Sequence, residues 1–217
     1  MYKVCFGAKM SPVRKIAYLG GSFDPVHEGH IAMAEAALAS GKCDEVWFGC
    51  AWIPPHKQKK PVSNIVHRIN MTALALEGRA GMKVCDFEAR MQFSPSYSFD
   101  VLSALQEKWP QNEFCMLIGA DSLMSLHTWY QAAELVRKFS FLSVRRPGFK
   151  IDREMLKNIW KDEKIAEKLL EGIIESRLSE AASTKIRKNF DQAVVLPEIR
   201  AYIELCRLYK NSVTVEE

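Results

Sequence analysis

A pair of adjacent glycines and two histidines gather in one stretch, residues 15–38, which reads KIAYLGGSFDPVHEGHIAMAEAAL. Gly20 and Gly21 follow a short apolar run, and His27 and His30 come shortly after them. A glycine-loosened turn from strand to helix lets backbone N–H groups approach a phosphate, and the helix N-terminus adds partial positive charge. If the helix has begun by His27, both imidazoles lie on one face of its first turn. The pattern predicts a phosphate-binding corner.

Each part of this pattern taken alone has an ordinary explanation. The histidines of an HxxH pair more often cap a helix or form hydrogen bonds within the core than bind a ligand. The corner is neither G-x-G-x-x-G nor a Walker A loop, and the run Ser40-Gly41-Lys42-Cys43 lacks the Ser or Thr that would bind magnesium. A dinucleotide fingerprint is therefore disfavoured, and the strength of the prediction comes from the density of the whole string.

Strand-like and helix-like segments alternate along the chain, which predicts an α/β fold: one Rossmann-like, doubly wound domain over residues 1–217 with a mainly parallel sheet and a helical C-terminal part. The expected strands are 16–20, 45–53, 82–87, 113–120 and 139–144. The expected helices are 28–41, one that Ser63 caps and that runs towards Gly78, one from Ser96 to Pro110, a long helical stretch from 151 to about 178, and one from Pro197 whose inner side carries Ile199, Tyr202, Ile203 and Leu205.

Composition narrows the class of protein. The chain has 217 residues, 48% of them hydrophobic, and a formal net charge of +4, which suits a single core and anionic small molecules. The six cysteines show no CxxC spacing, which favours a reducing cytoplasm and no zinc site. No run is long enough to span a membrane, and residues 1–13 do not resemble a signal peptide, so we treat them as an extension in which Met10 is a second candidate start.

The string GGSFDPVHEGH resembles the HxGH signature of the nucleotidylyltransferase superfamily, and its long form is similar to that of the bacterial nicotinate-nucleotide adenylyltransferases. Members of that family make deamido-NAD and pyrophosphate from ATP and nicotinate mononucleotide, in NAD biosynthesis. Further segments resemble family motifs in the same order: IPPHK (53–57), SYS (96–98), IGADS (118–122), TWY (128–130), RRPG (145–148) and STKIR (183–187). The stretch 149–182 is the least similar to the family.

The resemblance implies which residues bind ATP. His30 would contact the α-phosphate, His27 the phosphate chain, and Arg187 the β- and γ-phosphates; these three would carry the catalysis. The other ATP-binding residues expected are Gly20, Gly21, Ser22, Phe23, Gly119, Asp121 (on a ribose hydroxyl, or alternatively as a helix N-cap), Ser183 and Thr184. Protonated histidines would stabilise charge best, and neighbouring phosphates would favour that form. No catalytic base is required, because the attacking phosphate is already ionised at neutral pH.

The resemblance also implies how nicotinate mononucleotide binds. Trp129 would stack on the pyridine ring, while the Tyr130 backbone N–H and the Ser98 hydroxyl would bind the carboxylate. Lys57 and Arg146 complete the expected acceptor site. Mg²⁺ is expected as a cofactor carried by ATP phosphates and water, without protein ligands.

Several rivals stay open at this point. A nicotinamide mononucleotide adenylyltransferase, or another HxGH transferase, shares the corner. An inactive ATP-binding sensor is the non-enzyme alternative, and a nucleic-acid binder is disfavoured because no basic helix or aromatic platform is evident. No membrane partner is expected, and a homo-oligomer stays open.

Overall fold

The computed structural model describes residues 13–55, 63–145, 151–175 and 195–209. Within them, parallel strands form a six-stranded sheet in the order β3-β2-β1-β4-β5-β6. The strands are β1 Lys15–Gly21, β2 Glu45–Cys50, β3 Met82–Cys85, β4 Glu113–Gly119, β5 Ser140–Arg145 and β6 Ile173–Glu175. The strand order reverses its direction between β1 and β4, and ligands of such sheets bind in the crevice beyond the carboxyl ends of the strands at that point. The predicted doubly wound α/β fold is confirmed.

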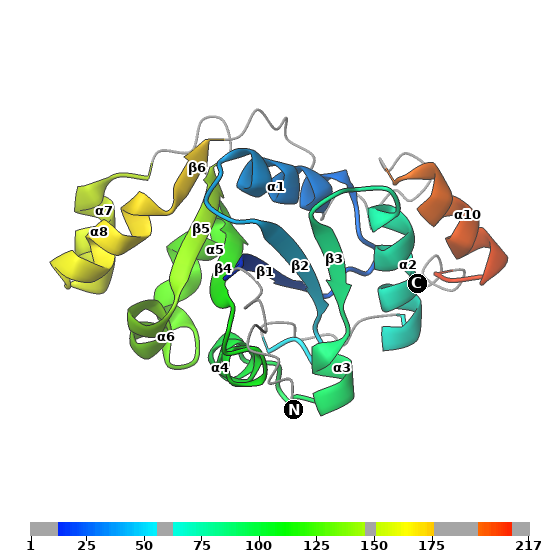
Figure 1. Cartoon of the computed structure of the whole chain (residues 1–217), viewed down its shortest axis with the longest axis horizontal. Coiled ribbons are helices and arrows are strands. Elements are labelled where there is room, and N and C mark those ends of the chain that lie inside the picture. Colours follow the sequence, from blue (N-terminus) through cyan, green and yellow to red (C-terminus); the bar gives the residue numbers. More distant parts are fainter. Residues whose placement is uncertain (1–12, 56–62, 146–150, 176–194, 210–217) are drawn as a thin grey trace, which may run out of the picture.

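Helices cover both faces of this sheet (Figure 1). Their bounds are α1 Glu28–Ala39, α2 Ile65–Leu76, α3 Phe87–Met91, α4 Ser98–Lys108, α5 Ala120–Ser125, α6 Ala132–Lys138, α7 Arg153–Trp160, α8 Glu163–Glu171 and α10 Pro197–Leu205, with a 3-10 turn η1 at Leu126–Thr128. Figure 1 shows α1 on one face of the strands, α2 and α10 beside each other at one end of the molecule, and α4 and α6 on the opposite face. The corner between β1 and α1 therefore joins the carboxyl end of the sheet to the helical layer that contains α1.

Alternate residues of each strand pack into two separate apolar cores. Ala17 and Leu19 belong to the core shared with α1, α2 and α10, whereas Ile16 and Tyr18 belong to the core shared with α3 to α8. A parallel sheet that is buried on both faces requires apolar side chains on both sides of each strand, which explains the continuous hydrophobic runs in the sequence. Among the described cysteines, Cys43, Cys50, Cys85 and Cys115 are buried free thiols and Cys206 is a half-buried one.

Three details of the predicted helices are wrong. Helix α2 is capped by Asn64, whose side chain accepts the N–H of Val66 at 3.0 Å, and not by Ser63. Leu205 is 82% exposed rather than on the inner side of α10, although Ile199 and Ile203 are buried there as expected. Helix α4 begins at Ser98 and not at Ser96, because Ser96 is buried and bonded to another loop.

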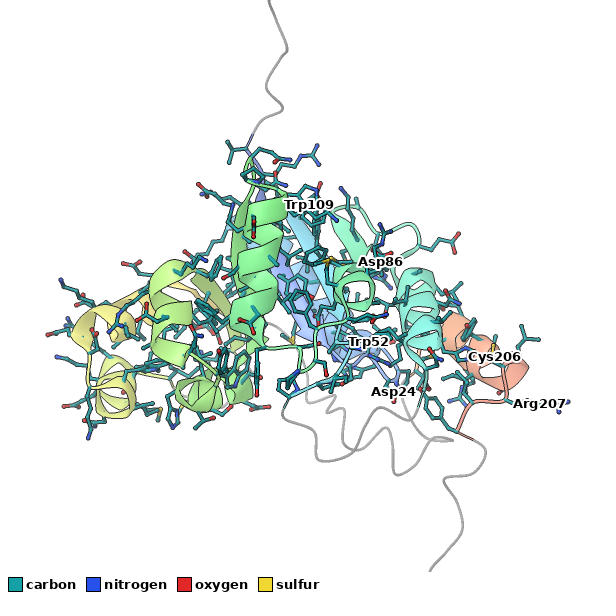
Figure 2. The ribbon with its side chains drawn as sticks, turned by 90° about the horizontal axis from the view of Figure 1, so that it is seen from below. Asp24, Trp52, Asp86, Trp109, Cys206 and Arg207 are labelled. Atoms are coloured by element: carbon teal, nitrogen blue, oxygen red, sulfur yellow. The ribbon has the colours of Figure 1, made fainter. Side chains whose placement is uncertain are left out.

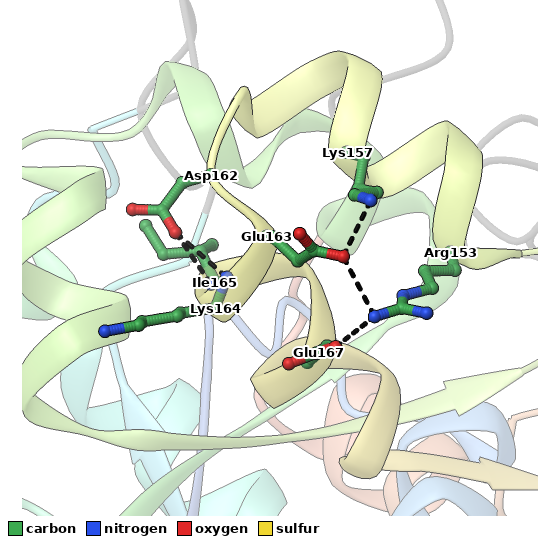
Figure 3. A network of polar contacts seen from close by, with 7 residues as sticks. All are labelled: Arg153, Lys157, Asp162, Glu163, Lys164, Ile165 and Glu167. Atoms are coloured by element: carbon green, nitrogen blue, oxygen red, sulfur yellow. Dashed lines mark hydrogen bonds and ion pairs between the residues drawn. The ribbon is translucent and has the colours of Figure 1, made fainter.

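The expected long helical stretch from 151 to about 178 is also divided. Lys161 takes a left-handed φ of 50° and Asp162 caps a new helix, so α7 and α8 form a hairpin. Lys157 contacts Glu163 at 2.7 Å, and Arg153 contacts both Glu163 and Glu167 across that hairpin (Figure 3). The chain then enters β6, which pairs with β5. With 3 residues, this strand is too short to give a clear strand pattern in the sequence.

Gly172 permits this last turn. A Cβ atom at Gly172 would lie 1.8 Å from the carbonyl oxygen of Phe141, so only glycine fits between α8 and β5. The helical hairpin is thereby held against the far edge of the sheet. Over the described parts of the chain, no helix has both the length and the apolar character needed to cross a bilayer.

Candidate active site

The corner between β1 and α1 is built from residues that follow one another in the sequence. Strand β1 ends at Gly21, and α1 takes His27 as its N-cap residue and His30 as its third residue. The His27 carbonyl accepts the N–H of His30 at 2.9 Å, which closes the first turn. The two histidines therefore do share the first turn of the helix, as the sequence predicts.

The two imidazoles stack on each other. Their ring centroids lie 3.6 Å apart with an interplanar angle of 28°. Nδ1 of His30 accepts the backbone N–H of His27 at 3.3 Å. Because a neutral imidazole carries one proton, this contact assigns the proton of the neutral ring to Nε2. In that tautomer, Nε2–H is the donor that His30 can offer to a phosphate oxygen.

Phe23 packs against the ring of His30. It is 2% exposed, takes a left-handed φ of 46°, and its ring meets the edge of the His30 ring at 4.9 Å. A Cβ atom at Gly21 would lie 3.0 Å from two carbons of the Phe23 ring, so a larger residue there would crowd Phe23. His27 is only 5% exposed, whereas His30 is half-buried. The more accessible imidazole is the one expected at the α-phosphate.

The carboxyl end of β4 lies at the same edge of the sheet as this corner, because β4 pairs with β1 in parallel. Gly119 is half-buried at the end of the strand and serves as the N-cap of α5, and Asp121 is exposed in the first turn of that helix. Asp121 is therefore not the N-cap, which removes the alternative explanation considered from the sequence. Its place at the carboxyl edge of the sheet is compatible with a contact to a ribose hydroxyl.

Among the described residues, those expected to bind the acceptor come from two separate segments. Ser98 is the first residue of α4, and Trp129 and Tyr130 follow η1. The rings of Tyr97 and Tyr130 stack with centroids 4.4 Å apart, which brings the two segments into contact. Within the described part of the chain, the backbone N–H of Tyr130 forms no backbone hydrogen bond. Trp129 is partly buried against the core, so packing accounts for part of its surface.

A buried polar group that the sequence did not reveal supports this side. The hydroxyl of Tyr18 donates to Glu88, which is 3% exposed and comes from α3. Burial raises the pKa of Glu88, and hydrogen bonds from the Ser96 and Tyr18 hydroxyls oppose that effect. A Cβ atom at Gly49 would lie 1.7 Å from the Tyr18 hydroxyl oxygen, which explains a glycine in the middle of β2.

Ser96 links this buried pair to the loops above it. Its Oγ accepts the backbone N–H groups of Trp52 and Ile53 at 3.1 and 3.3 Å, and its own N–H donates to the Ile53 carbonyl at 2.9 Å. The loop after β2 and the segment before Ser98 are therefore fixed to each other. The signal that could have found Ser96 is its place two residues before Ser98 in the SYS motif.

Some predicted site residues lie outside the described residues. They are Lys57, Arg146, Ser183, Thr184 and Arg187. Their assignments stay predictions. In the described part of the chain, no group of three or more His, Cys, Asp or Glu side chains is arranged to hold a metal ion.

Comparisons with known proteins identify the family of this chain. The model of the cytidylyltransferase-like family matches residues 18–189. The nicotinate-nucleotide adenylyltransferase of Bacillus subtilis (strain 168) is 38% identical over 140 residues, which cover 64% of this chain and 74% of that protein. A probable nicotinate-nucleotide adenylyltransferase of Bacillus licheniformis is 41% identical over 140 residues, with the same coverage of 64% and 74%.

Solved structures show the same fold. The nicotinic acid mononucleotide adenylyltransferase of Plasmodium falciparum, solved in complexes with APC and with NaAD, superposes with a TM-score of 0.71 over 90% of this chain and 97% of that chain, at 21% identity. At that identity the likeness concerns the fold, whereas the family rests on the sequence matches. The chain belongs to the cytidylyltransferase-like family and, within it, to the nicotinate-nucleotide adenylyltransferases.

Proposed function

We propose that the protein transfers the adenylyl group of ATP to nicotinate mononucleotide and releases pyrophosphate. The observation that carries this proposal is the pair of stacked imidazoles, 3.6 Å apart, at the N-terminus of α1 and at the carboxyl edge of the sheet. Relatives that are 38% and 41% identical carry the name of this activity. The chain is accordingly an enzyme of NAD biosynthesis in this account.

The reaction is an in-line displacement at the α-phosphorus of ATP. A phosphate oxygen of the mononucleotide forms a bond to the α-phosphorus, and the bond from that phosphorus to the oxygen bridging to the β-phosphorus breaks. The electron pair leaves with pyrophosphate. The nucleophile is ionised at neutral pH, so the protein has to position the reactants and stabilise charge rather than remove a proton.

His30 would supply that stabilisation. Its Nδ1 is held by the His27 backbone N–H, so Nε2–H is the donor that would face a non-bridging oxygen of the α-phosphate. The turn at Gly20 and Gly21 and the N-terminus of α1 would bind the phosphate chain. The donors are fixed before the substrate arrives, which is how preorganised hydrogen bonds lower a barrier.

Mg²⁺ is proposed to arrive bound to the phosphates of ATP. The one acidic side chain of the Ser22–His27 loop, Asp24, accepts hydrogen bonds from Ser63 and Tyr209, so the loop offers no separate carboxylate cluster. A Mg²⁺ ion that arrives with ATP does not require such a cluster, because phosphate oxygens and water can coordinate it. When bound, the ion would neutralise charge on the leaving pyrophosphate.

The acceptor is recognised, in this proposal, at the contact between α4 and the segment after η1. Trp129 would stack on the pyridine ring, while the Tyr130 N–H and the Ser98 hydroxyl would bind the carboxylate. An amide would leave its own N–H₂ facing a donor and would bind less well. Acid rather than amide is therefore the proposed acceptor.

The test is pyrophosphate release from ATP, measured with nicotinate mononucleotide and nicotinamide mononucleotide in parallel. We expect a higher kcat/KM for the acid. Equal values for the two would contradict the proposed acceptor specificity, and no release with either would contradict the proposed activity.

A further inference from the structure

The segment Ser22–Asp24, which leads into the two histidines, is held by side chains from elsewhere in the chain. Arg68 of α2 is 2% exposed. Its Nη1 donates to the Ser22 carbonyl at 2.8 Å and its Nε donates to the Ser63 carbonyl at 3.3 Å. Burial lowers the pKa of Arg68, and the charges of Cys50 and Asp24 oppose this. A guanidinium at this depth is retained because its hydrogen bonds compensate for lost solvation.

Asp24 is held at both of its oxygens. Oδ2 accepts the backbone N–H of Ser63 at 3.3 Å, and Oδ1 accepts the hydroxyl of Tyr209 at 2.6 Å. Tyr209 follows α10 and lies 185 positions further along the sequence. Figure 2 shows Asp24 near the end of α10, where Cys206 and Arg207 are labelled. Burial and the Asp24 carboxylate raise the pKa of the Tyr209 hydroxyl, which therefore remains a donor.

The attachment of α10 to the rest of the fold does not depend on Tyr209. Ile199 and Ile203 are buried in the core. The hydroxyl of Tyr202 accepts from Asn70 of α2 at 3.0 Å and lies 3.1 Å from Nδ1 of His67. Helix α10 thus has an apolar contact and a polar contact of its own with α2. The Tyr209 hydroxyl adds a bond to the loop that carries the histidines.

We propose that Tyr209 is a positioning residue for the phosphate-binding corner: it fixes Asp24 and, together with Arg68, sets the path of the backbone from Ser22 to His27. This inference rests on the proposed function of that corner. The segment that follows α10 thereby takes part in ATP binding without touching ATP. A loop fixed before ATP arrives loses less conformational entropy on binding, so the bond contributes to affinity for the triphosphate.

Tyr209→Phe and Tyr202→Phe form a matched pair of variants. Each removes one hydroxyl from the same C-terminal segment, but only the first contacts the phosphate-binding loop. With the acceptor saturating, we expect Tyr209→Phe to raise the KM for ATP about tenfold, the scale of having to order about one backbone residue of the loop on binding. Tyr202→Phe should stay within about twofold of the wild type, and both should show similar thermal unfolding.

A double-mutant cycle separates positioning from a general loss of stability. In an Asp24→Ala background, Tyr209→Phe should have a much smaller effect on the KM for ATP, because the carboxylate that accepts its hydrogen bond is already gone. Arg68→Lys keeps a buried cation but loses the fork, and we expect it to raise the same KM. If Tyr209→Phe matches Tyr202→Phe, or if its effect is undiminished in the Asp24→Ala background, the inference is wrong.

Calorimetric binding of a non-hydrolysable ATP analogue gives a readout that needs no acceptor. A tenfold weaker analogue affinity in Tyr209→Phe would support the inference even if the proposed acceptor were wrong. An analogue affinity equal to that of the wild type would overturn it while leaving turnover with nicotinate mononucleotide intact. The two failures are therefore distinguishable.

Discussion

The corner that would bind ATP and the side that would bind the acceptor are built in different ways. The corner comes from one continuous run, Gly20 to His30, and its central residues are almost fully enclosed, with Phe23 2% and His27 5% exposed. The acceptor side is assembled from separate segments, and Tyr130 remains 44% exposed. The functional side chains of the corner thus come from one run of sequence and are enclosed, whereas those of the acceptor side come from separate segments and are more exposed.

The difference follows from what each region has to do. Charge on a phosphorus centre is stabilised only by donors that are already in place, which favours buried and mutually supporting groups. Selection of one base over another depends on a few polar contacts at the rim, which separate segments can supply. We therefore expect substitutions in the corner to affect turnover and substitutions on the acceptor side to affect binding.

His30→Ala should have the largest effect, because it removes the donor at the α-phosphate. We expect kcat to fall by about two orders of magnitude or more while the fold is kept. Steady-state kinetics together with thermal unfolding measure this. His127→Ala, which removes an exposed imidazole, is the control. Near-normal turnover of His30→Ala would contradict the assignment of the corner.

Trp129→Ala should come next, and should act on the acceptor. Loss of stacking is expected to raise the KM for nicotinate mononucleotide about tenfold with a smaller change in kcat. Trp129→Phe, which retains an aromatic ring, should recover most of the affinity. If the alanine variant unfolds at lower temperature but binds the acceptor normally, Trp129 serves packing alone.

Ser98→Ala should have a smaller and more selective effect. One hydrogen bond to a carboxylate is worth about a factor of ten, so the preference for acid over amide should shrink by roughly that amount. The ratio of kcat/KM for the two mononucleotides reports it directly. Ser103→Ala, on the same helix, is the control; an unchanged ratio in Ser98→Ala would remove the hydroxyl from the recognition of the acceptor.

Glu88→Gln should have the smallest effect, which concerns stability. Burial raises the pKa of Glu88, so the folded protein holds this proton more tightly than the unfolded chain. The associated stability is fully present below the ordinary Glu pKa of about 4.3 and is lost as pH rises through the raised value. Glu88→Gln removes this titration but can still accept from Tyr18.

Thermal unfolding between about pH 4.5 and pH 8 tests this prediction. Over this pH range, the Tm of the wild type should fall about 2–4 °C more than the Tm of Glu88→Gln, the scale of one kcal/mol for a chain of this size. Glu107→Gln, at an exposed position, is the control and should not flatten it. An identical decline in Glu88→Gln and the wild type would show that Glu88 does not titrate in this range.

Much of this comparison could be predicted from the sequence, because its strongest features are local. The glycine pair, the HxxH spacing and the strand–helix alternation each act within a few residues, and the structure confirms the shared helical turn and the sheet. The N-cap of α2 is Asn64 rather than Ser63, a difference of one residue that is common when helix ends are predicted from sequence. The break between α7 and α8 could not be predicted, because Lys161 takes a left-handed backbone conformation at a position where no glycine marks the turn.

The contacts between distant segments could not be predicted. The bond from Tyr209 to Asp24 joins residues 185 positions apart, and Tyr18 reaches Glu88 over 70 positions. Both depend on which strands become neighbours and on where α10 packs. A single sequence does not contain that information in any local pattern.

A crystal structure with a non-hydrolysable ATP analogue tests the central claim most directly. The account predicts the triphosphate at the N-terminus of α1, with an α-phosphate oxygen about 2.7–3.2 Å from Nε2 of His30. A triphosphate bound elsewhere, with that imidazole directed into the apolar core, would contradict it.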